Sequence, residues 1–552
     1  MSGEPLVDEV VGVHIVLLRP SRVGRCWEQK TVPNQRLVGA QRVTFSLAFE
    51  AFLEGRFEES LAACDALSLR EDANRYEVAL LRARILLRFG FGDQALEALR
   101  ECAWTPTSVD QYVTAQMLRG AAHVRMGQVE RGEALLAEAS VPARDAHPTI
   151  RAELAMHLGI AYFQLQRWDD AQTQLASVEP REDIIYARAV QYLGWVEYMR
   201  GNLERGAELF HASLAALATS KRGDRYLEAN ILQSIASVSA ELFQTDRWLA
   251  IERRINAFDW TQDGLARPRF WIAMYASIIC ETMGQAAAAR TWARKAEASA
   301  ANTAYRVLAQ CRIAAIFRGL REAGAQREFV ERAKELYGTL NVADLVQDQK
   351  QLPLFLAEEM AFAGMHDEAL PLLAHYRADI APTVAMPGDD RHVGVELAVE
   401  GFVREAAGDY KIAIRLLSDA YRLQRKQGLR RRSSELALHL ARLTGAKRYS
   451  DFATKALAGV APSYWMVVQL AELGASGGPN LTETEKAILV HLVRGSAYKE
   501  IAAARHISWK TVSNHVQMLF RKFAVNSRGQ LAAEAIRRGL VALHDEGESR
   551  GA

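Results

Sequence analysis

Residues 498–523 read YKEIAAAR, HIS and WKTVSNHVQMLFRKF, which is two helical stretches separated by a three-residue turn. In the second stretch apolar side chains recur every three or four residues, the spacing of one buried helix face. They are Val512, Val516, Leu519, Phe520 and Phe523. Cations and short hydrogen-bonding side chains fall on the opposite face: Lys510, Ser513, Asn514, Gln517 and Arg521. Two helices joined by a short turn, the second with such a face, are typical of a helix-turn-helix.

The flanking sequence predicts two more helices around this pair. Thr482 and Glu485 have the spacing of a capping box, so we expect a helix that begins there and stops at Gly495. Ser508 is placed to cap the third helix, and a fourth helix follows Ser527. Residues 481–540 carry ten basic and four acidic side chains, although the whole chain is only +2. Basic charge is therefore concentrated in this segment, where it would attract nucleic acid.

At these residues the sequence closely resembles the LuxR-type DNA-binding domain. The resemblance covers residues 481–528 and rests on Leu481-Thr482, Glu485, Leu489, Gly495, Lys499-Glu500-Ile501-Ala502, Ile507-Ser508, Lys510-Thr511-Val512, His515, Arg521-Lys522, Val525 and Ser527-Arg528. It implies a four-helix module whose third helix enters the major groove and whose fourth forms a dimer contact. Two positions depart from the family: Arg505 replaces the usual Leu, and His506 replaces the usual Gly in the turn. A left-handed turn costs His more than Gly, so we expect strain there.

Each side chain of the module is assigned a role. Asn514 and Gln517 can pair with the edge of adenine, whereas Lys and Arg hold phosphates. The predicted DNA-binding residues are Lys499, Ser508, Lys510, Thr511, Ser513, Asn514, Gln517, Arg521 and Lys522. The predicted dimer contacts on the fourth helix are Leu531, Ala535 and Ile536. Symmetric half-sites on DNA would match such a two-fold dimer.

A repeat organises the chain from about residue 45 to about residue 460. A turn residue is followed two positions later by a large apolar residue and five positions later by a small one, as in Gly55/Phe57/Ser60 and Gly201/Leu203/Gly206. Successive turns lie 35 to 45 residues apart, a period of stacked helix–turn–helix units. Leu158-Gly159-x-x-Tyr162 and Leu193-Gly194-Trp195 resemble the tetratricopeptide repeat. We predict an all-α, tetratricopeptide-like helical-repeat solenoid of about eleven helical pairs, followed by the four-helix module.

These patterns divide the chain into five predicted segments. They are an unassigned N-terminal arm at 1–40, the solenoid at 41–471, a linker at 472–480, the helix-turn-helix domain at 481–542 and a flexible tail at 543–552. Together they resemble the sensor and DNA-binding parts of regulators related to the maltose activator, without the ATP-binding domain of those proteins.

The chain carries no motif for catalysis. The dipeptide Gly-Lys does not occur, which excludes a P-loop, and neither His-Glu-x-x-His nor clustered Cys and His appears. We therefore expect no enzyme, with no catalytic residue, no cofactor and no metal. The five cysteines are far apart, as in proteins of a reducing cytoplasm, and no stretch of about 20 apolar residues predicts a membrane span.

We therefore predict a transcriptional regulator of the bacterial type. It binds double-stranded DNA as a homodimer, receives an unknown effector on its repeats, and contacts RNA polymerase or another protein. The alternative is a repeat scaffold or anti-regulator whose C-terminal module binds protein instead of DNA. On the outward face of the third helix, only Trp509 is suited to anchor a protein partner.

Two groups of residues in the repeats have more than one interpretation. We interpret four tryptophans as packing residues, although they could line a groove: Trp195, Trp248, Trp271 and Trp292. The basic run at 422–432 is interpreted as a solvated helix end, with contact to nucleic acid or an acidic partner as the alternative.

Overall fold

The computed structural model describes most of the chain. The described residues are 44–53, 56–69, 74–89, 91–100, 106–180, 183–220, 223–261, 265–342, 345, 349–383, 390–475, 481–523, 525–537 and 540. The predicted arm at 1–40 and the predicted tail at 543–552 lie outside them. Every regular element of the described residues is helical, which confirms the all-α prediction.

The repeat region contains α1 to α23. Their bounds are α1 Phe45–Leu53, α2 Phe57–Ser68, α3 Arg75–Phe89, α4 Gly92–Arg100, α5 Val109–Arg125, α6 Val129–Ser140, α7 Pro148–Gln164, α8 Trp168–Ala176, α9 Ile184–Met199, α10 Leu203–Thr219, α11 Arg225–Leu242, α12 Thr245–Ala257, α13 Ala266–Thr282, α14 Ala286–Ala298, α15 Thr303–Gly319, α16 Ala323–Gly338, α17 Leu352–Phe362, α18 His366–His375, α19 Asp390–Ala406, α20 Tyr410–Lys426, α21 Arg430–Thr444, α22 Lys447–Ala456 and α23 Trp465–Ala475. Short helical turns lie at η1 Pro142–Asp145, η4 Tyr376–Ile380 and η5 Ala381–Thr383. None of the described helices is both long and apolar enough to cross a membrane.

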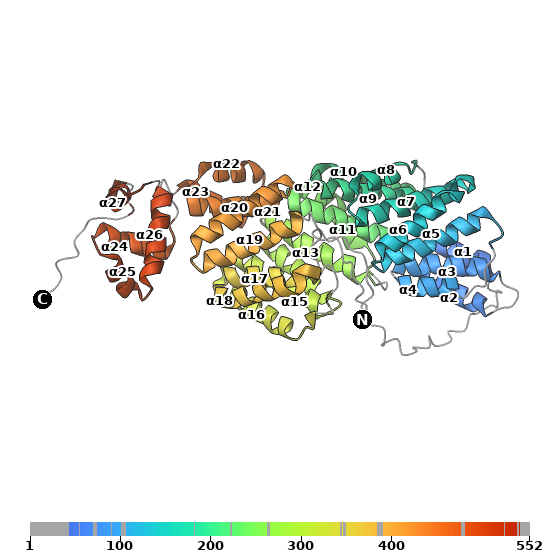
Figure 1. Ribbon diagram of the computed structural model, residues 1–552, viewed down its shortest axis with the longest axis horizontal. Coiled ribbons are helices and arrows are strands. Elements are labelled where there is room, and N and C mark those ends of the chain that lie inside the picture. The colour runs from blue at the N-terminus through green and yellow to red at the C-terminus, as the bar shows by residue number, and fades with distance from the viewer. Residues whose placement is uncertain are drawn as a thin grey trace, which may run out of the picture.

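Helices α1 to α22 pack as eleven consecutive pairs, as predicted for the repeat region (Figure 1). Small residues let the two helices of a pair approach closely. A Cβ added at Gly206 would lie only 2.9 Å from the carbonyl oxygen of Gly194, so α9 and α10 need glycine there. Ala171 is likewise completely buried where α8 meets α7. The recurring small residue of the sequence pattern therefore has a packing role.

The stacked pairs wind into a superhelix, so segments far apart in sequence lie side by side. In one half, the Tyr226 hydroxyl of α11 donates a hydrogen bond of 3.2 Å to Glu58 of α2. In the other half, the backbone N–H of Arg432 on α21 donates to Glu241 of α11 at 3.1 Å. Helix α11 therefore contacts helices from both halves of the solenoid.

The structure changes two interpretations that were made from the sequence, one of the repeat tryptophans and one of the basic run. Trp195, Trp248 and Trp271 are buried as expected, but Trp271 also lines a cavity of about 250 Å³. The basic run at 422–432 is not simply a solvated helix end. Arg432 donates hydrogen bonds of 2.7 Å to Glu358 and to Glu435, which line the same cavity. Glu435 is one turn further along α21, but Glu358 belongs to α17, 74 residues earlier, where no local pattern could place it beside Arg432.

Candidate nucleic-acid interface

The C-terminal module has four helices around its own apolar core. They are α24 Glu483–Val493, α25 Tyr498–Arg505, α26 Trp509–Phe523 and α27 Arg528–Arg537 (Figure 1). Ile488, Leu489 and Leu492 of α24 meet Val512, Val516, Leu519 and Phe523 of α26 in one buried cluster. The second and third helices run over 498–505 and 509–523, the ranges predicted from the sequence.

Local hydrogen bonds set the ends of these helices. At α24 the Thr482 Oγ1 accepts from the backbone N–H of Glu485 at 3.1 Å, and the Glu485 carboxylate accepts from the N–H of Thr482 at 2.7 Å. The Ser508 hydroxyl accepts from the N–H of Thr511 at 3.0 Å, which starts α26. His506 ends α25 in the left-handed conformation, with φ 53° and ψ 40°. Both predicted caps and the predicted strained turn are thus present.

The face of α26 opposite the core is open to solvent. Lys510, Gln517 and Arg521 are exposed, and Ser513 and Asn514 beside them are half-buried. Thr511 is also half-buried, whereas Ser508 and Lys499 are exposed at the turn and on α25. This arrangement presents hydrogen-bonding groups between cations on one helix face, and their contact with DNA stays a prediction.

Lys522 does not lie with the other predicted phosphate-binding residues. Its side chain is 1% exposed, and its Nζ donates to Glu485 Oε2 at 2.7 Å. Burial lowers the pKa of the Lys522 ammonium, and Glu485 opposes this shift. The prediction that Lys522 binds phosphate is therefore wrong for this conformation, because its charge is used inside the module.

The predicted dimer contacts also need correction. Leu531 and Ala535 are fully buried in the module's own core, so they hold α27 against the other helices. A charge at Leu531 would therefore destabilise the module itself, and is not a specific test of a dimer contact. Ile536 lies within α27, but its side chain is outside the described residues.

A third face of α26 packs against the last repeats, which the sequence analysis missed. His515, Met518 and Lys522 recur along this face and are all buried, although none of them belongs to the module's apolar cluster. Helix α26 contacts α21, and the His515 ring meets the Tyr410 ring edge-on with centroids 5.3 Å apart. Burial, together with the charge of Lys522, lowers the pKa of His515, although Glu485 opposes this. The polar character of His515 and Lys522 hid this contact from a search for apolar periodicity.

Residues 472–475, predicted as the start of the linker, continue helix α23, and 476–480 lie outside the described residues.

Comparison with known proteins identifies the module. The family described as bacterial regulatory proteins, luxR family, matches residues 479–535. The spore germination protein GerE of Bacillus subtilis is 38% identical over 65 residues, which are 12% of this chain and 88% of GerE. The chain belongs to the luxR family of bacterial regulatory proteins. The module is therefore a LuxR-family helix-turn-helix domain, as the sequence resemblance implied.

Other luxR-family relatives match over the same small region. The uncharacterized transcriptional regulatory protein YhcZ of Bacillus subtilis is 45% identical over 60 residues, which are 11% of this chain and 28% of YhcZ. The response regulator protein VraR of Staphylococcus aureus is 39% identical over 61 residues, 11% of this chain and 29% of VraR. The match thus spans less than a third of either relative.

Two solved structures are similar to about three quarters of the chain, at low sequence identity. A Rap protein complexed with competence and sporulation factor has a TM-score of 0.42 at 13% identity, covering 72% of this chain and 99% of that protein. The apo form of the quorum sensor NprR from B. thuringiensis has a TM-score of 0.36 at 12% identity, covering 75% and 97%.

Proposed function

We propose that this luxR-family protein is a sequence-specific, DNA-binding transcriptional regulator that reads DNA with α26. The observation that carries the proposal is the open face of α26, on which Asn514 and Gln517 lie between Lys510 and Arg521. A major groove about 12 Å wide accepts one helix, and amide side chains can then reach base edges. Lys499 on α25 lies exposed beside this face and would hold a phosphate.

We further propose that the repeats receive a signal and pass it to α26 through α21. The second half of the solenoid encloses a cavity of about 250 Å³ with aromatic walls from Trp271, Phe355 and Trp465. Arg431, Arg432 and Glu435 of α21 line the same cavity. Because α21 also packs against α26, an effector bound in this cavity would act on the helix that contacts the DNA reader.

The remaining parts of the proposal follow from this role. The protein acts in the cytoplasm, as a homodimer on DNA, and contacts RNA polymerase or another protein. It is not an enzyme and needs no cofactor. The dimer surface would use the outward side of α27, where Gly529 and Gln530 are exposed, because Leu531 and Ala535 are buried.

Genome-wide chromatin precipitation tests the proposal, with the full chain and with a chain that lacks 481–540. The full chain should enrich discrete sites that share a sequence, and the shortened chain should lose them. Absence of a shared sequence, or retention of the same sites by the shortened chain, would contradict DNA reading by the module.

The second candidate function is a scaffold whose C-terminal module binds protein. It rests on Trp509, whose side chain is 62% exposed at the start of α26 and could anchor a partner. Trp509→Ala separates the two functions. If the module reads DNA, this variant keeps its genomic sites, whereas loss of a co-purifying protein with normal DNA binding would favour the scaffold.

A further inference from the structure

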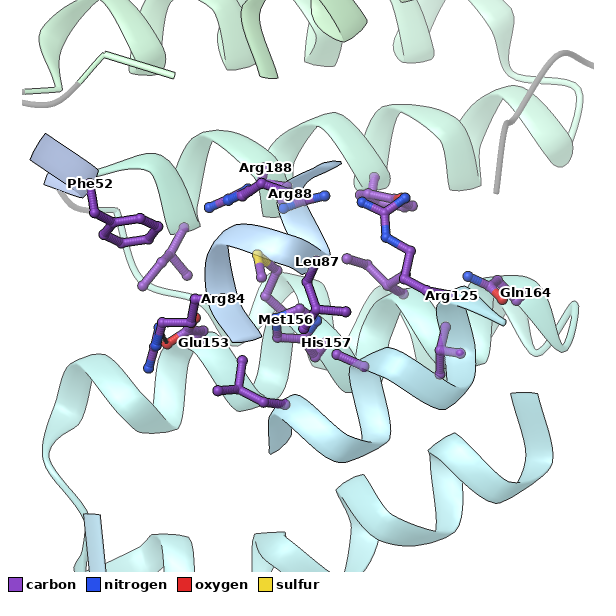
Figure 2. Close-up of a pocket in the computed structure, with 16 residues that line it drawn as sticks. Phe52, Arg84, Leu87, Arg88, Arg125, Glu153, Met156, His157, Gln164 and Arg188 are labelled. Carbon is purple, nitrogen blue, oxygen red and sulfur yellow. Dashed lines mark hydrogen bonds and ion pairs between the residues drawn. The ribbon is translucent and has the colours of Figure 1, made fainter. Parts of the chain in front are cut away.

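A small cavity in the first half of the solenoid is lined by four arginines. It lies among α3, α5, α7 and α9 and has a volume of about 50 Å³ (Figure 2). The arginines are Arg84 and Arg88 of α3, Arg125 of α5 and Arg188 of α9. Figure 2 shows Arg88 and Arg188 close together on one side of this cavity. Four like charges around so small a space need compensation from acidic groups or from a ligand.

Carboxylates compensate only two of these charges. Arg84 donates to Glu153 at 2.6 Å, and Arg88 lies 3.3 Å from Asp224. Among the described residues, neither Arg125 nor Arg188 forms a hydrogen bond or an ion pair with an acidic side chain. The described residues therefore leave two of the four positive charges around the cavity without an acidic partner.

Burial and the excess of positive charge both lower the pKa of groups around the cavity. Burial lowers the pKa of Arg88 to about 10; Asp224 opposes the shift and Arg188 adds to it. Burial, Arg188 and Arg88 likewise lower the pKa of His157 well below its usual value, so this lining residue is neutral at pH 7. An anion in the cavity would oppose the part of both pKa shifts that comes from the neighbouring arginines.

An unpartnered amide points to a ligand independently of the charges. Gln164 of α7 lines the cavity and is only 4% exposed. Neither its amide nitrogen nor its amide oxygen has a hydrogen-bond partner among the described residues. Buried polar atoms are nearly always paired, because an unpaired one costs free energy. Figure 2 places Gln164 on the side of the cavity where Arg125 lies, so one ligand can meet both.

We infer that this cavity binds a dianionic phosphate group, either inorganic phosphate or the phosphate of a small monoester. Two negative charges balance Arg125 and Arg188, whose planar guanidinium groups match phosphate oxygens. A cavity needs about 10–15 Å³ for each water, so 50 Å³ has room for the four oxygens of one phosphate. Gln164 donates to the phosphate through its amide nitrogen. The apolar walls at Met156 and Ile160 would accommodate the organic part of a monoester.

This inference goes beyond the proposed function, because it concerns binding by the repeats and does not depend on DNA. The test uses the full chain without DNA, with inorganic phosphate and glycerol 3-phosphate as separate probes. Sodium chloride at matched ionic strength controls for screening. Calorimetric titration and thermal unfolding should show saturable binding and a rise in melting temperature with phosphate but not with chloride.

The decisive variant is Arg125→Gln combined with Arg188→Gln. It removes the unbalanced charges, so its melting temperature without ligand should equal or exceed that of the wild type, and its response to phosphate should be lost. Gln164→Leu should stay folded and bind phosphate about tenfold more weakly. The matched control is Arg205→Gln, which alters an exposed arginine paired with Glu208 and should keep the full response.

Two results would overturn the inference. One is a wild-type chain that binds neither probe at millimolar concentration. The other is a double variant that melts below the wild type without ligand or retains phosphate binding, because the two arginines would then serve the fold alone. A response to glycerol 3-phosphate that exceeds the response to inorganic phosphate would support the inference and assign the organic part to the apolar wall.

Discussion

His506 shows how one residue position is strained by its place in the fold. It ends α25 with φ 53°, a left-handed conformation that costs a side chain with a Cβ about 1–2 kcal/mol. His506→Gly should therefore raise the free energy of unfolding of the module by about 1 kcal/mol. Urea denaturation of the isolated module, in which Trp509 is the one tryptophan, measures this change through its fluorescence. Ala503→Gly, an exposed position inside the same helix, is the matched control and should lower the free energy of unfolding by about 0.5–1 kcal/mol. Equal effects of the two glycines would contradict the strain.

Glu359 gives the stability of the repeats a pH dependence. Burial raises the pKa of the Glu359 carboxyl to about 7. Arg318 opposes this shift, but its guanidinium is shared with Glu435. The unfolded chain ionises Glu359 near its usual value of 4.5, so stability falls as the pH rises from 4.5 to 7 and then levels off. The free energy of unfolding of Glu359→Gln, relative to that of the wild type, should therefore increase by on the order of 3 kcal/mol as the pH rises from 4.5 to 8.

Urea unfolding of the full chain at several pH values measures this difference. Glu328→Gln, at an exposed carboxylate, is the control and should show no such trend. A constant difference between Glu359→Gln and wild type at all pH values would contradict the account.

At the scale of the helix, the sequence predicted those features that depend on residues close together in the chain. The bounds of α25 and α26, the cap at Thr482 and the strained His506 could all be predicted, because each follows from residues within one or two turns. The role of Lys522 could not be predicted, because its partner Glu485 lies 37 residues earlier. Leu531 was misassigned for a similar reason, since only the packed module shows which side of α27 is buried.

The Glu485–Lys522 pair between α24 and α26 predicts an asymmetric mutational response. Both side chains are 1% exposed, so removing one partner leaves a buried charge without compensation. Glu485→Gln should cost about 3–5 kcal/mol, whereas Glu485→Met together with Lys522→Met should cost only about 1 kcal/mol, for the lost capping hydrogen bond from the Thr482 N–H. Urea denaturation followed by Trp509 fluorescence measures both. If the loss of stability in the double variant equals the sum of the losses in the two single variants, the interaction between Glu485 and Lys522 contributes little to stability.

At the scale of the whole molecule, the repeat period predicted the solenoid but not its interior. The number of helical pairs followed from turns 35 to 45 residues apart. The winding brings Glu58 to Tyr226 and Glu241 to Arg432, pairs separated by 168 and 191 residues. No local pattern encodes such meetings, so neither the cavity arginines nor the ion pair of Arg432 with Glu358 could be anticipated.

The contact between α26 and the repeats predicts that the solenoid restrains DNA binding. A helix in the major groove meets groove walls on both flanks, but here the flank with His515 is covered by the repeats. Tyr410→Ala removes the ring packed on His515 and should raise DNA affinity about threefold to tenfold, the equivalent of one aromatic pair. Fluorescence anisotropy on operator DNA measures this change.

The matched control for that change is Tyr421→Ala. Tyr421 lies on the same helix α20, but its ring packs on Tyr449 and Phe452, away from the module. It should leave DNA affinity unchanged. Unchanged or lower affinity for Tyr410→Ala would show that the contact does not compete with DNA.

The central claim, that α26 reads DNA, is tested most directly by titrating operator and random duplex at two salt concentrations. Gln517→Ala or Asn514→Ala should reduce the preference for operator by about 1–3 kcal/mol and leave the salt dependence nearly unchanged. Lys510→Ala or Lys499→Ala should weaken binding to both duplexes alike and reduce the slope of log affinity against log salt by about 0.9. If the Gln517 and Asn514 variants keep the full preference for operator, α26 does not read the bases.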